Sequence, residues 1–231
     1  MPTQSPGRIL LLIVGACLLL GPAPAPSIPP QAPATQGGQV QPRKTSKPYT
    51  GDLSIFEYKD RDKKLQVERV MDILGIREGK TVADIGAGSG WFSVRAARRV
   101  MPTGLVYAVD INPEAIQYIQ QRVQREAIGN VRVIRSNPDN PLLPADSIDA
   151  VLLLKTYHEV AEPVALLKNL RKALRPSARV GIIDRNGDGG DHGVSRNVVV
   201  REAAQAGYTQ VGEYDFVKSD GEDYFLVFEL R

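Results

Sequence analysis

Apolar residues mark a change of period shortly after residue 60. They first recur three or four positions apart, at Val67, Val70, Met71 and Leu74. This spacing predicts an amphipathic helix between Asp60 and Leu74, and the glycine of LGIREGK indicates its end. The next apolar segment, TVADI at residues 81–85, is short and nearly continuous, as in a strand covered on both sides.

Short apolar segments then alternate with helical patterns. Strands are predicted at 81–85, 104–110, 131–135, 147–154, 179–184, 208–217 and 223–230, and helices at 90–100, 112–127, 163–174 and 195–206. Asn112 and Pro113 are a typical helix start. Alternation predicts a parallel sheet with helices on both faces, while KSDGED at 218–223 is typical of a hairpin between the last two strands.

The N-terminal part has a different composition. Arg8 precedes an apolar run at residues 9–20, which is shorter than the ~20 residues that span a bilayer and is typical of a signal peptide. The order VGAC is that of a bacterial lipoprotein cleavage site, which would place a lipid on Cys17; the alternatives are plain cleavage near 23–25 and an uncleaved anchor. Residues 1–25 therefore predict an exported, periplasmic or membrane-tethered protein. A later translation start would instead give a cytoplasmic one.

Residues 26–50 are rich in Pro, Ala and Gln, and we expect them to be a disordered linker before a domain at 51–231. The net charge of +3 is small and both signs are interspersed, so nucleic acid is not an expected partner. The single cysteine, Cys17, excludes a disulfide framework in the domain. We expect no metal, because DRNGDGGD at 184–191 lacks the terminal glutamate of a calcium loop.

The stretch VADIGAGSGWF at 82–92 carries the most specific chemistry. An acid ends the predicted strand, and glycines follow on alternate positions, which leaves a bare backbone at the carboxyl edge of the sheet. A dinucleotide site requires G-x-G-x-x-G, and its third glycine is replaced here by Trp91. A nicotinamide-dependent oxidoreductase is therefore disfavoured.

The alternate glycines after an acid resemble motif I of the class I S-adenosylmethionine-dependent methyltransferases. VYAVDINPEAI, LPADSIDAVLLLKTYHEV and LLKNLRKALRPSARVGIID extend the resemblance from Val67 to about Arg185. The arrangement is similar to the methyltransferase type 11 group, which includes the quinone C-methyltransferases. It implies an α/β, Rossmann-like domain with a seven-stranded, mostly parallel sheet whose last strand is antiparallel, and S-adenosyl-L-methionine as cofactor.

The resemblance also implies roles for single residues. Asp84 and the glycine loop would hold the methionine moiety, Asp110 the ribose hydroxyls, and Ile111 would flank the adenine. Relatives place an acid after the third strand to accept the adenine amino group, and either Asn137 or Asp139 could serve here. The implied cofactor-binding set is Asp84, Gly86, Ala87, Gly88, Gly90, Asp110, Ile111, Asn137, Asp139 and Lys155.

The segment KTYHEV at 155–160 follows the fourth strand and would lie beside the cofactor. His158 titrates in a range that suits a general base, and Tyr157 and Glu159 are its companion catalytic candidates; a helix cap or a cavity wall is the alternative role. His192 lies in the loop after the fifth strand. Candidates for a lid precede the first helix: Phe56, Tyr58, Arg61 and Asp62.

These observations predict in-line methyl transfer to a small-molecule or lipid-like acceptor. Because S-adenosylmethionine is a cytoplasmic metabolite, the alternative is a catalytically silent binding module that is tethered at the envelope and keeps the methyltransferase fold. The sequence leaves the acceptor and the oligomeric state open.

Overall fold

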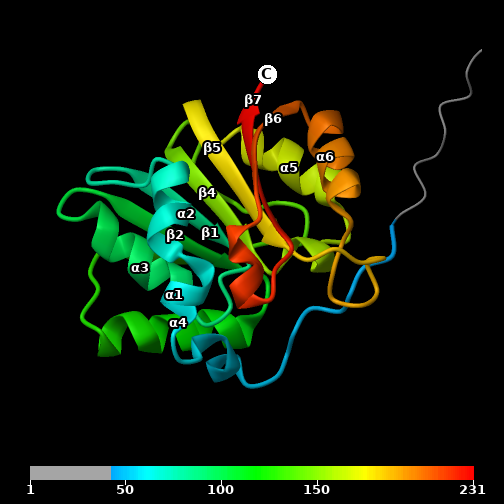
Figure 1. The fold of residues 1–231 in the computed structure, drawn as a ribbon. Coiled ribbons are helices and arrows are strands. Elements are labelled where there is room, and N and C mark those ends of the chain that lie inside the picture. Colours follow the sequence, from blue (N-terminus) through cyan, green and yellow to red (C-terminus); the bar gives the residue numbers. More distant parts are fainter. Residues whose placement is uncertain (1–42) are drawn as a thin grey trace, which may run out of the picture. The chain divides into compact units, whose positions relative to one another are not determined.

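The computed structural model describes residues 43–231, which form one sheet with helices on both sides (Figure 1). The predictions for residues 1–25, and for the linker as far as residue 42, lie outside the described residues. The strands are β1 (Thr81–Ile85), β2 (Leu105–Asp110), β3 (Val131–Arg135), β4 (Ile148–Leu154), β5 (Leu174–Asp184), β6 (Tyr208–Tyr214) and β7 (Tyr224–Leu230). The α-helices are α1 (Arg61–Leu65), α2 (Val67–Ile73), α3 (Trp91–Val100), α4 (Pro113–Arg125), α5 (Pro163–Arg171) and α6 (Arg196–Gln205).

The strand order is β3-β2-β1-β4-β5-β7-β6. Strands β1 to β5 pair in parallel, whereas β7 runs antiparallel to both β5 and β6. The predicted fold is therefore confirmed. The last strand lies inside the sheet, between β5 and β6, and brings its hydrogen bonds to both neighbours.

Successive residues of the central strands enter two different cores. Val82 packs with residues of α2 and α3, whereas Ala83 packs with residues of α5 and α6 on the other face. Leu152 and Leu153 of β4 repeat this division, and both are fully buried. Burial of each such leucine contributes about 2 kcal/mol, so the near-continuous apolar pattern of these strands follows from two covered faces.

The predicted helix between Asp60 and Leu74 is two helices in the structure. Gln66 lies between α1 and α2 with φ 54°, a left-handed conformation that interrupts the helical hydrogen bonds. Its side-chain amide donates to the carbonyl oxygen of Phe216 at 3.2 Å. The apolar stripe of α2 is nevertheless buried as predicted.

Residues 43–50 pack on the domain, although their composition predicts a linker. Arg43 donates to the carbonyl oxygens of Tyr157 at 2.6 Å and of Val160 at 3.2 Å. The Oγ of Ser46 donates to the carbonyl oxygen of Gly189 at 3.1 Å. Polar contacts rather than apolar burial hold this segment, which is why hydrophobicity alone does not reveal it.

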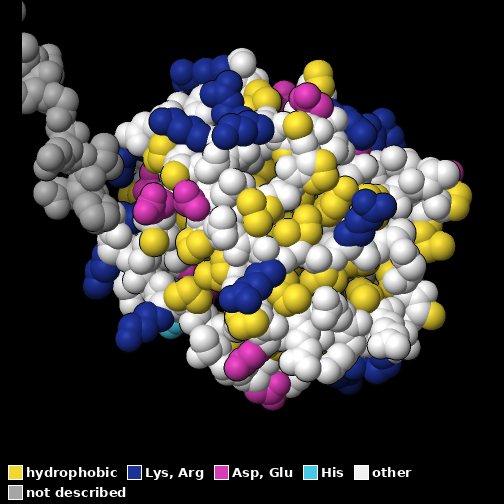
Figure 2. Space-filling view, turned by 180° about the vertical axis from the view of Figure 1, so that it is seen from behind, with side chains coloured by type: hydrophobic (Ala, Val, Ile, Leu, Met, Phe, Trp, Pro, Cys, Tyr) yellow, Lys and Arg dark blue, Asp and Glu magenta, His cyan; other side chains and the backbone are white. Residues whose placement is uncertain are grey.

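The face behind the view of Figure 1 has hydrophobic side chains gathered in its middle, with most Lys and Arg side chains around them (Figure 2). Within residues 43–231, no helix combines the length and the apolar character that crossing a membrane requires.

Candidate active site

A cavity of about 430 Å³ lies at the carboxyl edge of β1, β2 and β4. We call it the sheet-edge cavity. Its walls come from the glycine loop at 86–89, the end of β2, the segment after β4 and residues 45–49. Phe56 and Arg61, two of the four lid candidates, also line it. The predicted site residues that line the cavity are Asp84, Gly86, Ala87, Gly88, Asp110, Ile111, Asn137, Lys155 and Glu159.

The glycine loop approaches the segment after β4 too closely for a side chain at its first glycine. Gly86 has φ 71°, and a Cβ atom built there would lie 2.2 Å from Oγ1 of Thr156. Gly90 caps α3 and does not line the cavity, and a Cβ there would lie 3.2 Å from Ile119. The first glycine thus keeps the loop against β4, while Gly90 serves packing between α3 and α4.

Asp110 ends β2 and receives two main-chain hydrogen bonds. Its Oδ2 accepts the N–H of Gly88 and its Oδ1 accepts the N–H of Asn112, both at 2.9 Å. Burial raises the pKa of this carboxyl, and the main-chain donors oppose that rise. A carboxylate has about four acceptor positions, so both oxygens can still accept a hydrogen bond from a diol in the cavity.

Asp84 ends the apolar part of β1 and is almost fully buried. Burial raises its pKa to about 7, and the hydroxyl of Ser93, which donates to Oδ2 at 2.6 Å, partly offsets this effect. A cation placed beside Asp84 in the cavity would favour its ionised form. Asp84 therefore fits the ammonium group of a methionine moiety.

The structure separates the two candidates for the adenine contact. Asn137 lines the cavity. Asp139 does not, and its main-chain oxygen accepts from the side-chain amide of Asn169 at 2.9 Å. Lys155 lines the cavity but is already paired, because its Nζ lies 2.7 Å from Oε1 of Glu222.

The three catalytic candidates occupy different environments. Tyr157 is fully buried away from the cavity, and its hydroxyl donates to Oε2 of Glu202 at 2.9 Å. It is a core residue here, because the short 3₁₀ turn at Tyr157–Glu159 points successive side chains in different directions. His158 is 5% exposed and lies behind the cavity wall. Glu159 lines the cavity itself.

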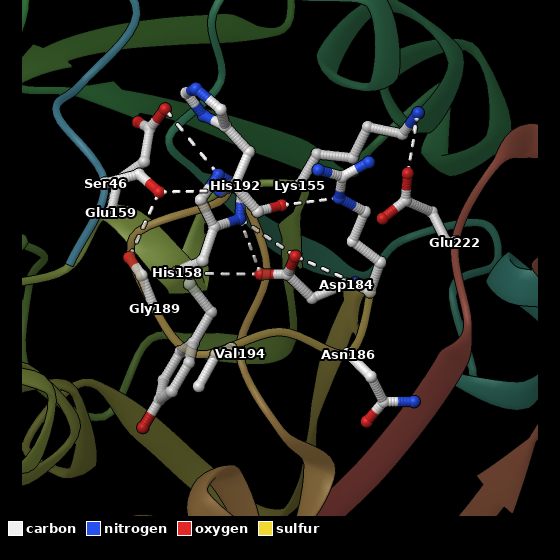
Figure 3. A network of polar contacts seen from close by, with 12 residues as sticks. Ser46, Lys155, His158, Glu159, Asp184, Asn186, Gly189, His192, Val194 and Glu222 are labelled. Atoms are coloured by element: carbon white, nitrogen blue, oxygen red, sulfur yellow. Dashed lines mark hydrogen bonds and ion pairs between the residues drawn. The ribbon is translucent and has the colours of Figure 1, made fainter. Parts of the chain in front are cut away.

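Asp184, at the end of β5, orients the ring of His158. Oδ1 of Asp184 lies 2.8 Å from Nδ1 of His158, and Oδ2 accepts the main-chain N–H of the same residue at 3.0 Å (Figure 3). Burial lowers the pKa of His158, but the hydrogen bond and charge of Asp184 outweigh it and the pKa is raised. Sequence reasoning missed Asp184, although an acid at the end of RVGIID repeats the pattern of β1 and β2.

The free edge of the His158 ring faces two further polar residues. Its Nε2 lies 3.8 Å from Oε1 of Glu159. The ring of His192, from the loop after β5, is edge-on to that of His158 with 5.7 Å between centroids. Figure 3 shows these three side chains together, with Asp184 on the opposite side of His158. Burial raises the pKa of Glu159 to about 7.

The site can accommodate S-adenosyl-L-methionine in its donor set. A buried acid stands at the end of β1, a second acid with free acceptor positions at the end of β2, and a bare loop lies between them. These groups match an ammonium, a ribose diol and a ligand that touches the main chain.

Comparisons with known proteins agree with this geometry. The sequence profile of a family described as "Methyltransferase domain" matches residues 76–207. The ubiquinone/menaquinone biosynthesis C-methyltransferase UbiE of Citrobacter koseri is 26% identical over 115 residues, which are 49% of this chain and 46% of that protein. The aligned region thus spans about half the length of this curated relative.

Two solved structures are also similar. An S-adenosylmethionine-dependent methyltransferase from Aquifex aeolicus has a TM-score of 0.68 and 26% identity, over 78% of this chain and 98% of that one. The geranyl diphosphate C-methyltransferase of Streptomyces coelicolor, solved with Mg²⁺, geranyl diphosphate and S-adenosyl-L-homocysteine, has a TM-score of 0.57 and 17% identity, over 81% and 89%. At this identity the second likeness concerns the fold.

Proposed function

The chain belongs to the methyltransferase-domain family, and we propose that it transfers a methyl group from S-adenosyl-L-methionine to a small-molecule or lipid-like acceptor. One observation carries the proposal: the acids that end β1 and β2 open into one cavity on either side of the glycine loop. A catalytically silent module would have no physical need for two buried carboxylates around a bare backbone.

Each part of the cavity then has a task toward the cofactor. Asp110 accepts the two ribose hydroxyls, and Asp84 balances the charge of the ammonium group. The main chain at Gly86 and Gly88 lies along the methionine moiety, and Asn137 accepts from the adenine amino group. The cofactor supplies a methyl group on a positively charged sulfur, ready for in-line displacement.

In-line displacement requires alignment more than acid or base chemistry. Holding two reactants in line in a dry site can supply about 7–11 kcal/mol of the barrier in the best cases. Residues 45–49 and Phe56 cover the cavity and would exclude water from it. The chain's main contribution is therefore the shape of the closed cavity.

We propose a phenol- or quinol-like acceptor. Two features support this class: apolar and aromatic side chains of the cavity wall, among them Leu53, Phe56 and Trp91, and the name of the relative UbiE, a quinone C-methyltransferase. Such an acceptor carries a hydroxyl whose proton must be lost or weakened. This task falls to the His158–Glu159 pair at the cavity wall.

The test has two stages. Titration calorimetry of the full chain with S-adenosyl-L-homocysteine should give saturable binding at one site; absence of binding contradicts the proposal. Transfer of a labelled methyl group should then be measured with quinols, phenols and small amines. Binding without transfer to any of them would favour the silent binding module instead.

A further inference from the structure

Three potential metal-ligating groups converge beside the sheet-edge cavity. They are the imidazoles of His158 and His192 and the carboxylate of Glu159, and one ligand atom from each lies within 4.8 Å of the others. The chain contains two histidines, and both are in this cluster. Two imidazoles and one carboxylate form a donor set that first-row divalent cations favour.

Asp184 sets the ring of His158 in the orientation that a metal ligand needs. Its carboxylate receives Nδ1 at 2.8 Å, so that Nδ1 carries the proton and Nε2 is left as a lone-pair donor toward Glu159. A carboxylate behind a ligating histidine is a common support in metal sites, because it fixes the tautomer and raises the ligand's basicity. Asp184 itself is fully buried, so this orientation is firmly held.

The main chain of His192 is held in an unfavourable conformation. Its φ is 60°, in the left-handed region that side chains other than Asn, Asp and Gly rarely adopt. Its N–H donates to Oγ of Ser46 at 2.9 Å, and its carbonyl oxygen accepts from Nε of Arg185 at 2.8 Å. Contacts on both sides therefore fix an exposed histidine toward His158 at the cost of local strain.

We propose that His158, Glu159 and His192 bind one first-row divalent cation, of which Zn²⁺ is the best match. A tetrahedral Zn²⁺ with bonds of about 2.1 Å needs ligand atoms about 3.4 Å apart. Nε2 of His158 and Oε1 of Glu159 are already 3.8 Å apart. His192 lies on a loop, so a small movement of its side chain completes the set.

Three protein ligands leave the fourth position of the ion open, which is the arrangement of catalytic rather than structural zinc sites. Glu159 lines the sheet-edge cavity, so the open position is adjacent to it. If the proposed methyl transfer holds, the ion would bind the acceptor's oxygen and weaken its O–H bond. The binding of the ion itself does not depend on that reaction.

The sequence predicts no metal because the ligands do not form a local motif. Residues 158 and 159 follow β4, whereas residue 192 follows β5 in a separate loop. Parallel pairing of β4 with β5 brings the two segments to the same edge of the sheet. The cluster therefore depends on tertiary structure.

Metal binding can be measured on the full chain in a Cys17→Ser background, which removes the thiol as a competing ligand. Zn²⁺ affinity is obtained by competition with a chromophoric chelator, and Co²⁺ is used as a spectroscopic probe of coordination. The test variants are His192→Gly, which suits the left-handed backbone, and Glu159→Gln. The matched control is Glu162→Gln, an exposed carboxylate three positions further on.

We expect one equivalent of Zn²⁺ to bind with submicromolar affinity and Co²⁺ to give visible absorption bands of a four- or five-coordinate site. His192→Gly should weaken Zn²⁺ binding at least 100-fold and Glu159→Gln at least 10-fold, whereas Glu162→Gln should leave it unchanged. His192→Gly should not lower the Tm of the metal-free protein. Micromolar or weaker binding, or binding that His192→Gly does not affect, would overturn the proposal. Binding of S-adenosyl-L-homocysteine in the presence of EDTA tests the proposed function separately.

Discussion

Asp110 accepts the main-chain N–H of Gly88 through Oδ2 at 2.9 Å. This bond ties the tip of the glycine loop to the end of β2, across 22 positions of the chain. The part of the cavity assigned to the methionine moiety and the part assigned to the ribose are therefore positioned by one carboxylate. A change at Asp110 should disturb both.

Replacing Asp110 by Ala should weaken binding of S-adenosyl-L-homocysteine at least tenfold, which corresponds to about 1.4 kcal/mol or more. The change removes the acceptor for the ribose hydroxyls and leaves the N–H of Gly88 without its partner. Calorimetric titration measures the effect. The matched control is Asp139→Ala, which removes an acid near the cavity that does not line it and should leave affinity within a factor of two.

A methyl group at the first glycine of the loop should be poorly tolerated. Gly86→Ala introduces a Cβ atom 2.2 Å from Oγ1 of Thr156 and forces alanine into a left-handed conformation. The two effects together should lower the free energy of unfolding by about 2 kcal/mol and abolish cofactor binding. Urea denaturation checks the first outcome, and calorimetry the second.

The control for Gly86 is Gly129→Ala. A Cβ atom at Gly129 meets nothing within 4 Å, and its backbone is outside the left-handed region. This variant should be as stable as the wild type or slightly more stable, because alanine reduces the freedom of the unfolded chain. Equal stability of the two variants would contradict the close approach of the loop to Thr156.

Asp84 should make the cofactor-free protein less stable as the pH rises from 5 to 8. Burial raises its folded-state pKa to about 7, so the folded state holds a proton that the unfolded state releases near pH 4. Stability then falls with rising pH until about pH 7 and stays constant above it. In Asp84→Asn this contribution is removed, and the free energy of unfolding should fall less between pH 5 and pH 8.

A second acid supplies the control for this pH dependence. Burial raises the pKa of Asp149, but hydrogen bonds from Thr81 and Lys80 outweigh it and hold the pKa below its usual value. Its stabilising contribution is fully present above about pH 4 and is lost only at lower pH. Asp149→Asn should therefore leave the slope between pH 5 and pH 8 as it is in the wild type. The idea fails if Asp84→Asn gives that same slope.

Arg43 should anchor residues 43–50 far more strongly than its neighbour Lys44. Arg43 is largely buried, bonds two main-chain carbonyls and pairs with Glu202 at 3.1 Å, whereas Lys44 pairs with Asp188 on the surface. Arg43→Ala should lower the free energy of unfolding by about 2 kcal/mol and Lys44→Ala by less than about 0.5 kcal/mol. Urea denaturation of both variants decides between this order and equal effects.

The fold and most of the cofactor-binding set follow from local patterns in the sequence. The apolar segments and their alternation with helices predict all seven strands, since every strand of this sheet is a short local run. Acids at strand ends and glycines after β1 are likewise local signals. They locate Asp84, Gly86, Gly88 and Asp110, and parallel strands bring them to one edge.

The remaining features depend on contacts between distant segments. Nothing near Tyr157 in the sequence indicates that its hydroxyl meets Glu202 in the core, or that His158 lies behind the cavity wall while Glu159 lines it. The approach of His192 to His158 requires the loop after β5 to fold back across the end of β4. Helical periodicity also gives no sign of the left-handed break at Gln66.

The position of β7 has a consequence for the order in which the sheet can assemble during protein synthesis. Among the described strands, β6 pairs with β7 alone, and β7 pairs with β5 on its other side. A ribosome completes Tyr208–Tyr214 before Tyr224–Leu230, so β6 has no partner strand when it emerges. The five parallel strands can pair as they are made, whereas the last two must wait for Tyr224–Leu230 to leave the exit tunnel.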